Sequence, residues 1–306
     1  MTEHTIVIGG GVGGMVAALR ARRHGASVQL VEARDQLGGL ASSVAAGGTT
    51  FDGGPYILLD QDRLRWALDR VGVDLDTLDL VVRSTLAYTI DGAAGWSVAV
   101  YTDLDRTAEE LKQAEPGSGD RYRAFVAKAG AALDRLAPLL TEAHSAGRFV
   151  TSGAWRAAPW TLASLRQLLR LNRLDGPAAA ATSIWTLIAG GDPARAPGPM
   201  ALVPALIHRD GAVRPAGGVH QIVGLLEAAL VDAGVEVIRN APVEAIVTAS
   251  GPAAFVLSPA GSFRPKWSSA TSAAPLRCST SSTSLRRLDC GSGCGAGCSR
   301  RVSRPT

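Results

Sequence analysis

Three glycines near the amino terminus have the spacing of a phosphate-binding turn. Gly9, Gly11 and Gly14 follow the short β-branched stretch Thr5–Ile8 and precede an alanine-rich stretch. In such a turn the first glycine allows a tight bend, the second lets the backbone approach a pyrophosphate, and the third permits close helix–strand packing. The amino end of the following helix offers unpaired N–H groups to an anion. The pattern therefore predicts a site for the diphosphate of a dinucleotide.

An acid follows at the position where such sites bind a ribose. Glu32 ends a second expected strand, Ser27–Val31, after a helix expected over about residues 15–24 that ends at Gly25. Strand, helix and strand in this order predict a βαβ unit with parallel strands. The carboxylate can accept hydrogen bonds from both ribose hydroxyls and would repel a 2′-phosphate. The complete succession favours a dinucleotide site over an incidental glycine-rich turn.

FAD and NAD both use this turn, so the choice between them depends on later residues. A second glycine pair, Gly38-Gly39, follows the acid, and the stretch Phe51–Pro55 (FDGGP) offers another small-residue backbone that suits a flat ring. Nicotinamide dehydrogenases usually lack the second pair. The sequence therefore favours a flavin.

On these residues the sequence resembles the flavin amine-oxidase superfamily, and within it the phytoene desaturase (carotenoid dehydrogenase) branch. Further matches cover residues 190–197, 214–218 and 234–243, while Leu40 stands where the family usually has arginine. The resemblance implies FAD-dependent dehydrogenation of an apolar isoprenoid or carotenoid-like substrate by hydride transfer to FAD. Two alternatives stay open: an amine-oxidase-type FAD enzyme acting on another small molecule, and an inactive remnant that binds FAD or another nucleotide.

The expected cofactor-binding residues come from all of these motifs. They are Gly9, Gly11, Val12, Gly13, Gly14, Glu32, Ala33, Arg34, Gly38, Gly39, Leu40, Gly54 and Pro55 and, by the resemblance, the backbone of Val243. No catalytic side chain is assigned. The five histidines show no catalytic spacing, and His220, which begins a helix after a glycine turn, is the one that could lie near the flavin.

The predicted fold is α/β, with a Rossmann-type FAD-binding domain and an inserted, largely helical substrate domain. The expected boundaries are residues 1–83 and 201–257 for the FAD-binding domain and 84–200 for the substrate domain. A strand pair is expected around Leu86–Tyr101, a helix over Val219–Ala233, and strands near Val235–Arg239 and Val243–Thr248. Compared with the family, the fold is expected to be incomplete at the carboxyl end, where a further strand and a Gly-Asp element are missing.

Residues 258–306 differ in composition from the rest of the chain. They hold eight Lys or Arg, one acid and all four cysteines, and they are rich in serine. Two interpretations stay open: a disordered basic tail, or a segment read out of frame, because residues 265–269 in GC-rich codons give Glu-Val-Val-Val after a one-base shift. The cysteine spacing does not predict a metal site. The remaining body is slightly acidic, which argues against a nucleic-acid partner.

The composition and hydropathy bear on compartment and partners. With 46% hydrophobic and 19% charged residues, the 306-residue chain is globular. No apolar run approaches the ~20 residues of a spanning helix, and no signal-peptide pattern precedes Thr5, so a cytoplasmic protein is expected. Trp160–Leu174 is expected to form one basic amphipathic helix, with an arginine face and a stripe of Leu162, Leu165 and Leu169. This helix either packs on its own domain or lies on the anionic inner face of a membrane.

Overall fold

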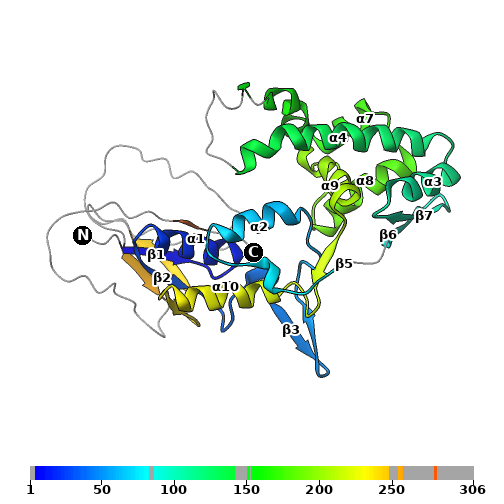
Figure 1. Ribbon diagram of the computed structural model, residues 1–306. Coiled ribbons are helices and arrows are strands. Elements are labelled where there is room, and N and C mark those ends of the chain that lie inside the picture. The colour runs from blue at the N-terminus through cyan, green and yellow to red at the C-terminus, as the bar shows by residue number, and fades with distance from the viewer. Residues whose placement is uncertain are drawn as a thin grey trace, which may run out of the picture. The chain divides into compact units, whose positions relative to one another are not determined.

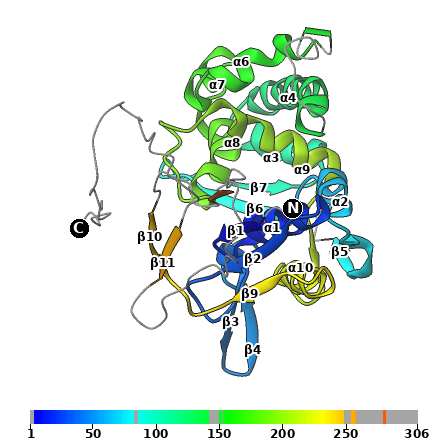
Figure 2. The same ribbon diagram turned by 90° about the vertical axis from the view of Figure 1, so that its left-hand side faces the viewer.

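The computed structural model describes residues 4–82, 86–141, 150–151, 153–247, 254–257 and 279–280. The chain divides into two compact units (Figures 1 and 2). The first unit comprises residues 1–56, 68–78 and 217–306, and the second comprises 57–67 and 79–216. Residues 57–67, 79–82 and 201–216, which the sequence places in the cofactor domain, belong to the second unit. Residues 201–216 do so because helix α9 (Val203–Asp210) packs on helices α4 (Ser118–Thr141) and α8 (Gly176–Ile188). Most of the tail at 258–306 lies outside the described residues.

A parallel sheet forms the centre of the first unit. Its strand order is β12-β1-β2-β9, and each neighbouring pair is parallel. The strands are β1 (His4–Ile8), β2 (Ser27–Val31), β9 (Glu236–Ile238) and β12 (Ser279–Thr280). Helix α1 (Val12–Arg23) connects β1 to β2, so the predicted βαβ unit and the α/β fold class are confirmed.

Helix α1 ends close to where its sequence indicates, but it begins at Val12, three residues before the expected start. It ends in a turn with three arginines, whose charges interact favourably with the carbonyl end of the helix dipole. Gly25 follows with φ +88°, a conformation that glycine adopts at little cost. Helix α10 (Gln221–Asp232) packs beside α1 and covers its apolar residues. Buried Met15, Leu19 and Leu226 belong to the core of this unit.

Two antiparallel strand pairs complete the first unit. The hairpin of β3 (Ser43–Ala46) and β4 (Thr49–Asp52) extends away from the sheet (Figures 1 and 2). Its turn is Gly47-Gly48, and both glycines have positive φ, as a two-residue hairpin turn of type I′ requires. Strand β10 (Val243–Val247) pairs with β11 (Ala254–Leu257). Short 3-10 helices lie at η1 (Gly39–Ala41) and η2 (Leu75–Thr77).

The second unit is largely helical, as expected for the inserted domain. Its helices pack around α4, whose Tyr122 and Phe125 are fully buried in the core. The hairpin of β6 (Leu86–Asp91) and β7 (Ser97–Tyr101) confirms the predicted strand pair, and β5 (Leu80–Val82) pairs with β8 (Val213–Pro215). The other elements are α2 (Gln61–Asp69, whose last two residues belong to the first unit), α3 (Leu104–Ala114), α4 (Ser118–Thr141), η3 (Ala154–Ala157), α6 (Ala158–Leu162), α7 (Leu165–Leu171), α8 (Gly176–Ile188) and η4 (Gly198–Leu202).

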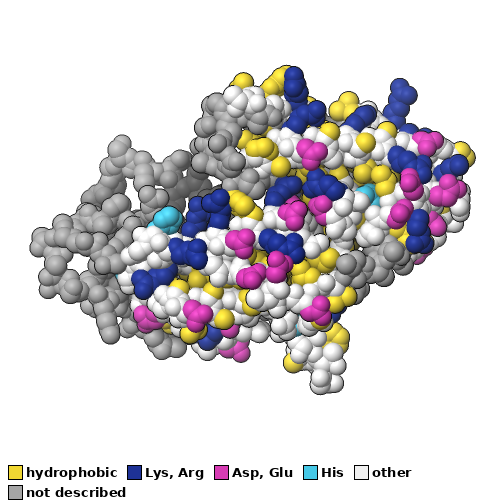
Figure 3. Space-filling model, in the orientation of Figure 1, with side chains coloured by type: hydrophobic (Ala, Val, Ile, Leu, Met, Phe, Trp, Pro, Cys, Tyr) yellow, Lys and Arg dark blue, Asp and Glu magenta, His cyan; other side chains and the backbone are white. Residues whose placement is uncertain are grey.

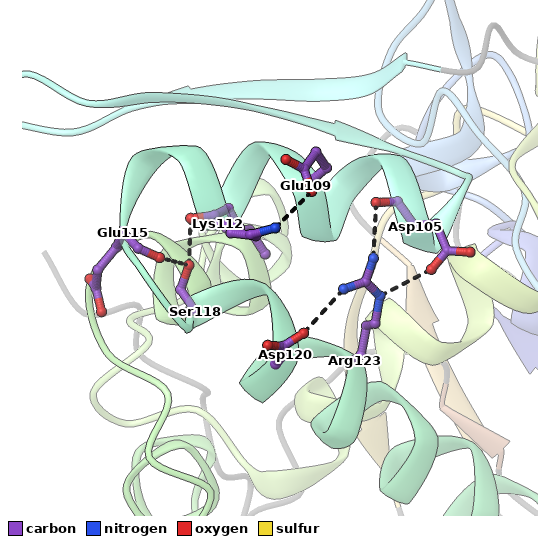
Figure 4. A network of polar contacts seen from close by, with 8 residues as sticks. Asp105, Glu109, Lys112, Glu115, Ser118, Asp120 and Arg123 are labelled. Carbon is purple, nitrogen blue, oxygen red and sulfur yellow. Dashed lines mark hydrogen bonds and ion pairs between the residues drawn. The ribbon is translucent and has the colours of Figure 1, made fainter.

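A short polar joint connects α3 to α4 (Figure 4). The Ser118 hydroxyl donates to the carbonyl of Leu111 at 2.5 Å and lies 2.7 Å from the carbonyl of Glu115. Arg123, five residues further along α4, contacts Asp105 on α3 at 3.0 Å. At Gly119 a Cβ would stand only 2.1 Å from the carbonyl oxygen of Ala108. The two helices therefore approach backbone to backbone, which only glycine permits at this position.

The expected continuous helix over Trp160–Leu174 is wrong. Helix α6 ends at Leu162, and α7 begins at Leu165 with Ser164 as its cap. The break has a long-range cause, because the N–H of Leu165 donates to the carbonyl of Ala196 and the N–H of Gly198 donates to that of Ala163. These bonds hold the chain in a non-helical conformation between α6 and α7.

The break also rearranges the leucine stripe. Leu165 and Leu168 are buried, Leu169 is partly buried, and Leu162 and Leu171 are 85% and 76% exposed. None of the described helices has the length and hydropathy of a bilayer-spanning segment.

Candidate dinucleotide site

The glycine turn between β1 and α1 has the shape that its spacing predicts. Gly9 has φ +97°, and its N–H donates to the carbonyl of Val31 at 2.8 Å. Gly11 is the residue before the first turn of α1, no side chain caps it, and no acid lies in that turn. The N–H groups at this helix end therefore have no acceptor within the helix, and they carry the positive end of its dipole. Such an end can bind a diphosphate.

Glu32 lies beside this turn with its carboxylate facing it. Oε2 accepts a hydrogen bond from the N–H of Gly10 at 2.6 Å, and Oε1 accepts one from the N–H of Arg34 at 2.9 Å. The residue is only 8% exposed. A carboxylate has about four acceptor positions, so two backbone bonds leave capacity for hydroxyl donors. Glu32 thus holds the turn in place and can still accept bonds from a ribose.

The second glycine pair packs on the first. The N–H of Gly38 donates to the carbonyl of Gly10 at 2.8 Å, and Gly38 pairs with Gly11 as an isolated parallel bridge. A Cβ on Gly39 would lie 3.0 Å from the Cα of Gly11, and Gly39 has φ +61°. The two motifs therefore form one surface of bare backbone, which we call the glycine floor (residues 9–14 and 38–39).

The motif at residues 51–55 continues this surface. The N–H of Gly53 donates to the carbonyl of Ser42 at 2.8 Å, and a Cβ on Gly54 would stand 2.3 Å from the carbonyl oxygen of Leu40. Pro55 follows and is exposed, and the Leu40 side chain is 83% exposed. This segment reaches the glycine floor through the intervening residues 40–42.

The remaining expected residues lie at the carboxyl ends of β1 and β2. Val243 begins β10 and is partly buried against the cluster of Ile6 and Val31, and the N–H of Ala241 donates to the carbonyl of Glu32 at 2.9 Å. Ala33 and Arg34 follow Glu32 directly and are exposed, and Val12, Gly13 and Gly14 form the first turn of α1. All the expected cofactor residues thus belong to the first unit.

Sequence reasoning missed one polar pair beside this surface. Asp52 Oδ1 lies 3.1 Å from the backbone N and 3.0 Å from Nδ1 of His220. Burial alone would raise the pKa of Asp52, but hydrogen bonds from His220 and from the N–H of Val219 outweigh it and lower the pKa. Each residue lies in a glycine-rich motif of its own, and their contact across 168 residues has no local signal in the sequence.

A second polar pair, formed by buried Tyr122 and partly buried His208, lies in the second unit, remote in sequence from the glycine motifs. Tyr122 OH is 3.0 Å from His208 Nε2, and His208 Nδ1 is 3.0 Å from the carbonyl oxygen of Thr102. The carbonyl can only accept, so Nδ1 carries the proton and Nε2 accepts from the tyrosine. Burial lowers the pKa of His208 and raises that of Tyr122. His208 therefore has a core role.

Neither of two open cavities lies at the glycine floor. A groove of about 460 Å³ runs between α1, α10 and residues 71–77, with Leu19 and Leu225 among its apolar lining and Arg23 and Asp74 among its charged lining. A second, of about 440 Å³, lies between α4 and α7 and includes Trp160. Among the described residues no group of three or more His, Cys, Asp or Glu is placed to hold a metal ion.

A strand, glycine turn, helix and parallel strand with a terminal acid define a dinucleotide-binding domain of the Rossmann type. In agreement, residues 7–71 match the family model described as an NAD(P)-binding Rossmann-like domain.

Comparison with curated proteins shows which dinucleotide-binding proteins the chain is similar to. The chain is 30% identical over 255 residues to 4,4'-diapolycopen-4-al dehydrogenase of Metabacillus indicus, covering 82% of this chain and 52% of the relative. It is 30% identical over 250 residues to the neurosporene-forming phytoene desaturase of Rhodobacter capsulatus, covering 79% and 47%. The chain is thus similar to carotenoid desaturases and dehydrogenases, in line with the resemblance of its motifs, and it spans about half the length of the curated relatives it matches.

Solved structures support the fold. Putrescine oxidase in complex with putrescine aligns with a TM-score of 0.55 at 23% identity, covering 84% of this chain and 55% of that one. An oxidoreductase from Methanosarcina mazei aligns with a TM-score of 0.51 at 17% identity, covering 83% and 55%. At these identities the similarity shows a shared fold and no more.

Proposed function

We propose that this chain carries the FAD site of an oxidoreductase that dehydrogenates an apolar isoprenoid or carotenoid-like substrate. The observation that carries the proposal is the packing of Gly38-Gly39 on the turn at Gly10-Gly11, in a chain similar to carotenoid desaturases. A plain nicotinamide site needs only the first glycine turn. The second pair extends the bare backbone along the path that a longer, flavin-bearing dinucleotide would follow.

The described residues fit FAD in their chemistry. The N–H groups at the start of α1, from Gly11 to Gly14, would bind the diphosphate, and Glu32 would bind the ribose hydroxyls. Gly54 and Pro55 would face the flavin ring, and the backbone of Val243 would lie beside adenine. Because the exposed Leu40 brings no charge, neutralisation of the diphosphate depends on backbone N–H groups and the dipole of α1.

When bound, FAD would supply the redox chemistry by accepting a hydride from the substrate. The chain itself would bind and orient the cofactor and keep the reacting carbon away from water. A hydrocarbon substrate offers no heteroatom for a side chain to protonate. Dehydrogenation removes a hydride from one carbon and a proton from its neighbour, so the site would need orientation, an apolar surround and an acceptor for that proton.

Cofactor binding tests the first half of the proposal. The purified chain is expected to retain yellow flavin absorption, or to regain it on titration with FAD, and to bind FAD more tightly than NAD or NADP in calorimetry. NADP should bind most weakly, because Glu32 would repel its 2′-phosphate. A colourless protein that binds NAD and ignores FAD would show that the flavin assignment is wrong.

Turnover tests the second half. With FAD bound, and with a quinone or dioxygen present to reoxidise the reduced flavin, phytoene in detergent micelles is expected to gain visible polyene absorption, whereas putrescine should give no hydrogen peroxide. Oxidation of putrescine instead would favour an amine-oxidase-type enzyme. FAD binding without turnover of either compound would favour a nucleotide-binding remnant.

We also propose peripheral contact of the second unit with anionic lipid. Residues 160–174 contain Arg166, Arg170 and Arg173 and no acid, and all three arginines are exposed. Leu162 and Leu171 are largely exposed beside them. In Figure 3 hydrophobic and basic side chains lie next to one another along the upper edge of this unit. Exposed leucines among basic residues suit an interface of anionic headgroups and acyl chains.

A further inference from the structure

Two glycine-rich segments that lie far apart in the sequence meet at one carboxylate. Asp52 ends β4, and His220 stands directly before α10, 168 residues later. The Asp52 and His220 side chains are only 10% and 19% exposed. Oδ1 of Asp52 accepts from the backbone N–H of His220 at 3.1 Å and lies 3.0 Å from Nδ1 of the same residue.

Through these contacts Asp52 caps α10 from another segment of the chain. No side chain of α10's own N-cap residue, His220, accepts from the first turn of that helix. A carboxylate at a helix amino end satisfies N–H groups and interacts favourably with the dipole. Gly218 allows the approach: it has φ +108°, and a Cβ there would stand 2.8 Å from Oδ1 of Asp52.

The two helices of the first unit thus differ at their amino ends. The end of α10 already faces the negative charge of Asp52, whereas the end of α1 has no acid in its first turn and no side-chain cap. An incoming diphosphate would be repelled by the first and attracted by the second.

Helix α10 also contacts the glycine floor. Cγ2 of Val223, in the first turn of α10, lies 3.1 Å from the position that a Cβ on Gly38 would take. Gly38 in turn donates to the carbonyl of Gly10 at 2.8 Å. The cap at Asp52, the first turn of α10, Gly38 and the phosphate-binding turn therefore form one continuous series of contacts.

We propose that Asp52 and His220 are positioning residues for the dinucleotide: their bond fixes the first turn of α10 against Gly38, and so holds the glycine floor in its binding conformation. This inference rests on the proposed cofactor site. It requires that loss of the bond weaken nucleotide binding, and not only the stability of the free protein.

The experiment compares Asp52→Ala, Asp52→Asn, His220→Ala and the double alanine variant with the unchanged protein. Asp69→Asn is the matched control, because Asp69 is an exposed acid of the same unit. Each protein is titrated calorimetrically with FAD and separately with ADP, which carries only the adenosine and diphosphate that all dinucleotides share. The melting temperature of each free protein is recorded beside its affinities.

Asp52→Ala is expected to lower the affinity for FAD and for ADP about tenfold, in keeping with the loss of a hydrogen bond to a charged group. Asp52→Asn should lose less affinity, because its amide oxygen can still accept a hydrogen bond from the backbone N–H of His220. His220→Ala should weaken binding about threefold, since the backbone bond to Asp52 remains. The fold-loss of affinity in the double alanine variant should be smaller than the product of the fold-losses in the two single alanine variants, because both remove the same interaction. Asp69→Asn should bind both ligands as the unchanged protein does.

Some outcomes overturn the inference. If the Asp52 and His220 variants lower the melting temperature but bind ADP and FAD as the unchanged protein does, the pair is only structural. If Asp52→Ala does not fold, the affinities and melting temperature of His220→Ala decide the question instead. If the unchanged protein binds ADP and not FAD, the proposed function fails and the inference is judged on the ADP series. If it binds neither ligand, both fail.

Discussion

Glu32 shows how one side chain can hold a binding turn and still be available to a ligand. Its two oxygens accept from the N–H groups of Gly10 and Arg34, so the turn is braced before any ligand arrives. The position of this acid was predictable, because a βαβ unit fixes how far the end of β2 lies from the glycine turn. Its bond to Gly10 was not predictable, because that contact depends on the detailed path of the backbone.

Replacement of Glu32 should therefore impair both stability and binding. Glu32→Ala is expected to lower the free energy of unfolding by about 1–3 kcal/mol, because the buried N–H of Gly10 loses its acceptor. FAD affinity should fall at least about tenfold, because the ribose acceptor is lost as well. Urea unfolding and FAD titration measure the two effects. Glu109→Gln, at an exposed acid, is the control, and unchanged FAD affinity in Glu32→Ala would contradict the assigned role.

His208 makes a different prediction, which concerns acid. Because burial lowers its pKa below the ordinary 6.5, the unfolded chain binds a proton more readily than the folded one. The stability that results is complete above pH 6.5 and is lost as the pH falls from there toward the folded-state pKa. The pKa of Asp52 is lowered from 3.8, so its contribution is lost only at more acid pH.

Urea unfolding between pH 8 and pH 5 tests this assignment. The free energy of unfolding should decline below about pH 6.5 in the unchanged protein, and the decline should be smaller in His208→Gln. Tyr122→Phe removes the hydroxyl that donates to Nε2 and should lower stability at pH 8 as well. An equal decline in His208→Gln would assign the acid sensitivity to another group.

At the scale of elements, local patterns predicted well and long-range bonds did not. The limits of β1, β2 and the β6–β7 hairpin follow from glycine, Asp-Gly and β-branched residues close to each boundary. The break between α6 and α7 could not be predicted in this way. It depends on hydrogen bonds to Ala196 and from Gly198, more than thirty residues away, and the leucine periodicity alone favours one helix.

The joint of α3 and α4 allows a matched test of a close approach between elements. Gly119→Ala would place a Cβ 2.1 Å from the carbonyl oxygen of Ala108, so the helices must separate (Figure 4). We expect a loss of about 1–3 kcal/mol in the free energy of unfolding. Gly130→Ala, in the same helix and with no atom within 4 Å of the new Cβ, should instead gain about 0.5–1 kcal/mol. Equal effects in denaturant unfolding would refute the close approach.

At the scale of the whole molecule, the division into two units was predictable in kind and less so in its boundaries. The glycine motifs identify the cofactor unit, because each is local and chemically distinctive. Residues 201–216 were harder to assign, since helix α9 is placed by apolar packing on α4 and α8 and carries no motif. Packing partners of a short helix cannot be deduced from its own residues. For the same reason the sequence could not show which leucines of residues 160–174 are buried and which are exposed.

The exposed leucines make the last prediction, on association with lipid. The unchanged protein is expected to co-sediment with vesicles containing phosphatidylglycerol, to bind less as salt screens the arginines, and to bind phosphatidylcholine vesicles poorly. Leu162→Ser with Leu171→Ser should weaken binding at least about tenfold, because two side chains lose their burial in the bilayer interface. Leu187→Ser with Val231→Ser, at two exposed apolar positions outside residues 160–174, is the control. If both double variants bind equally, or if the unchanged protein stays in solution, the lipid contact does not lie at α6 and α7.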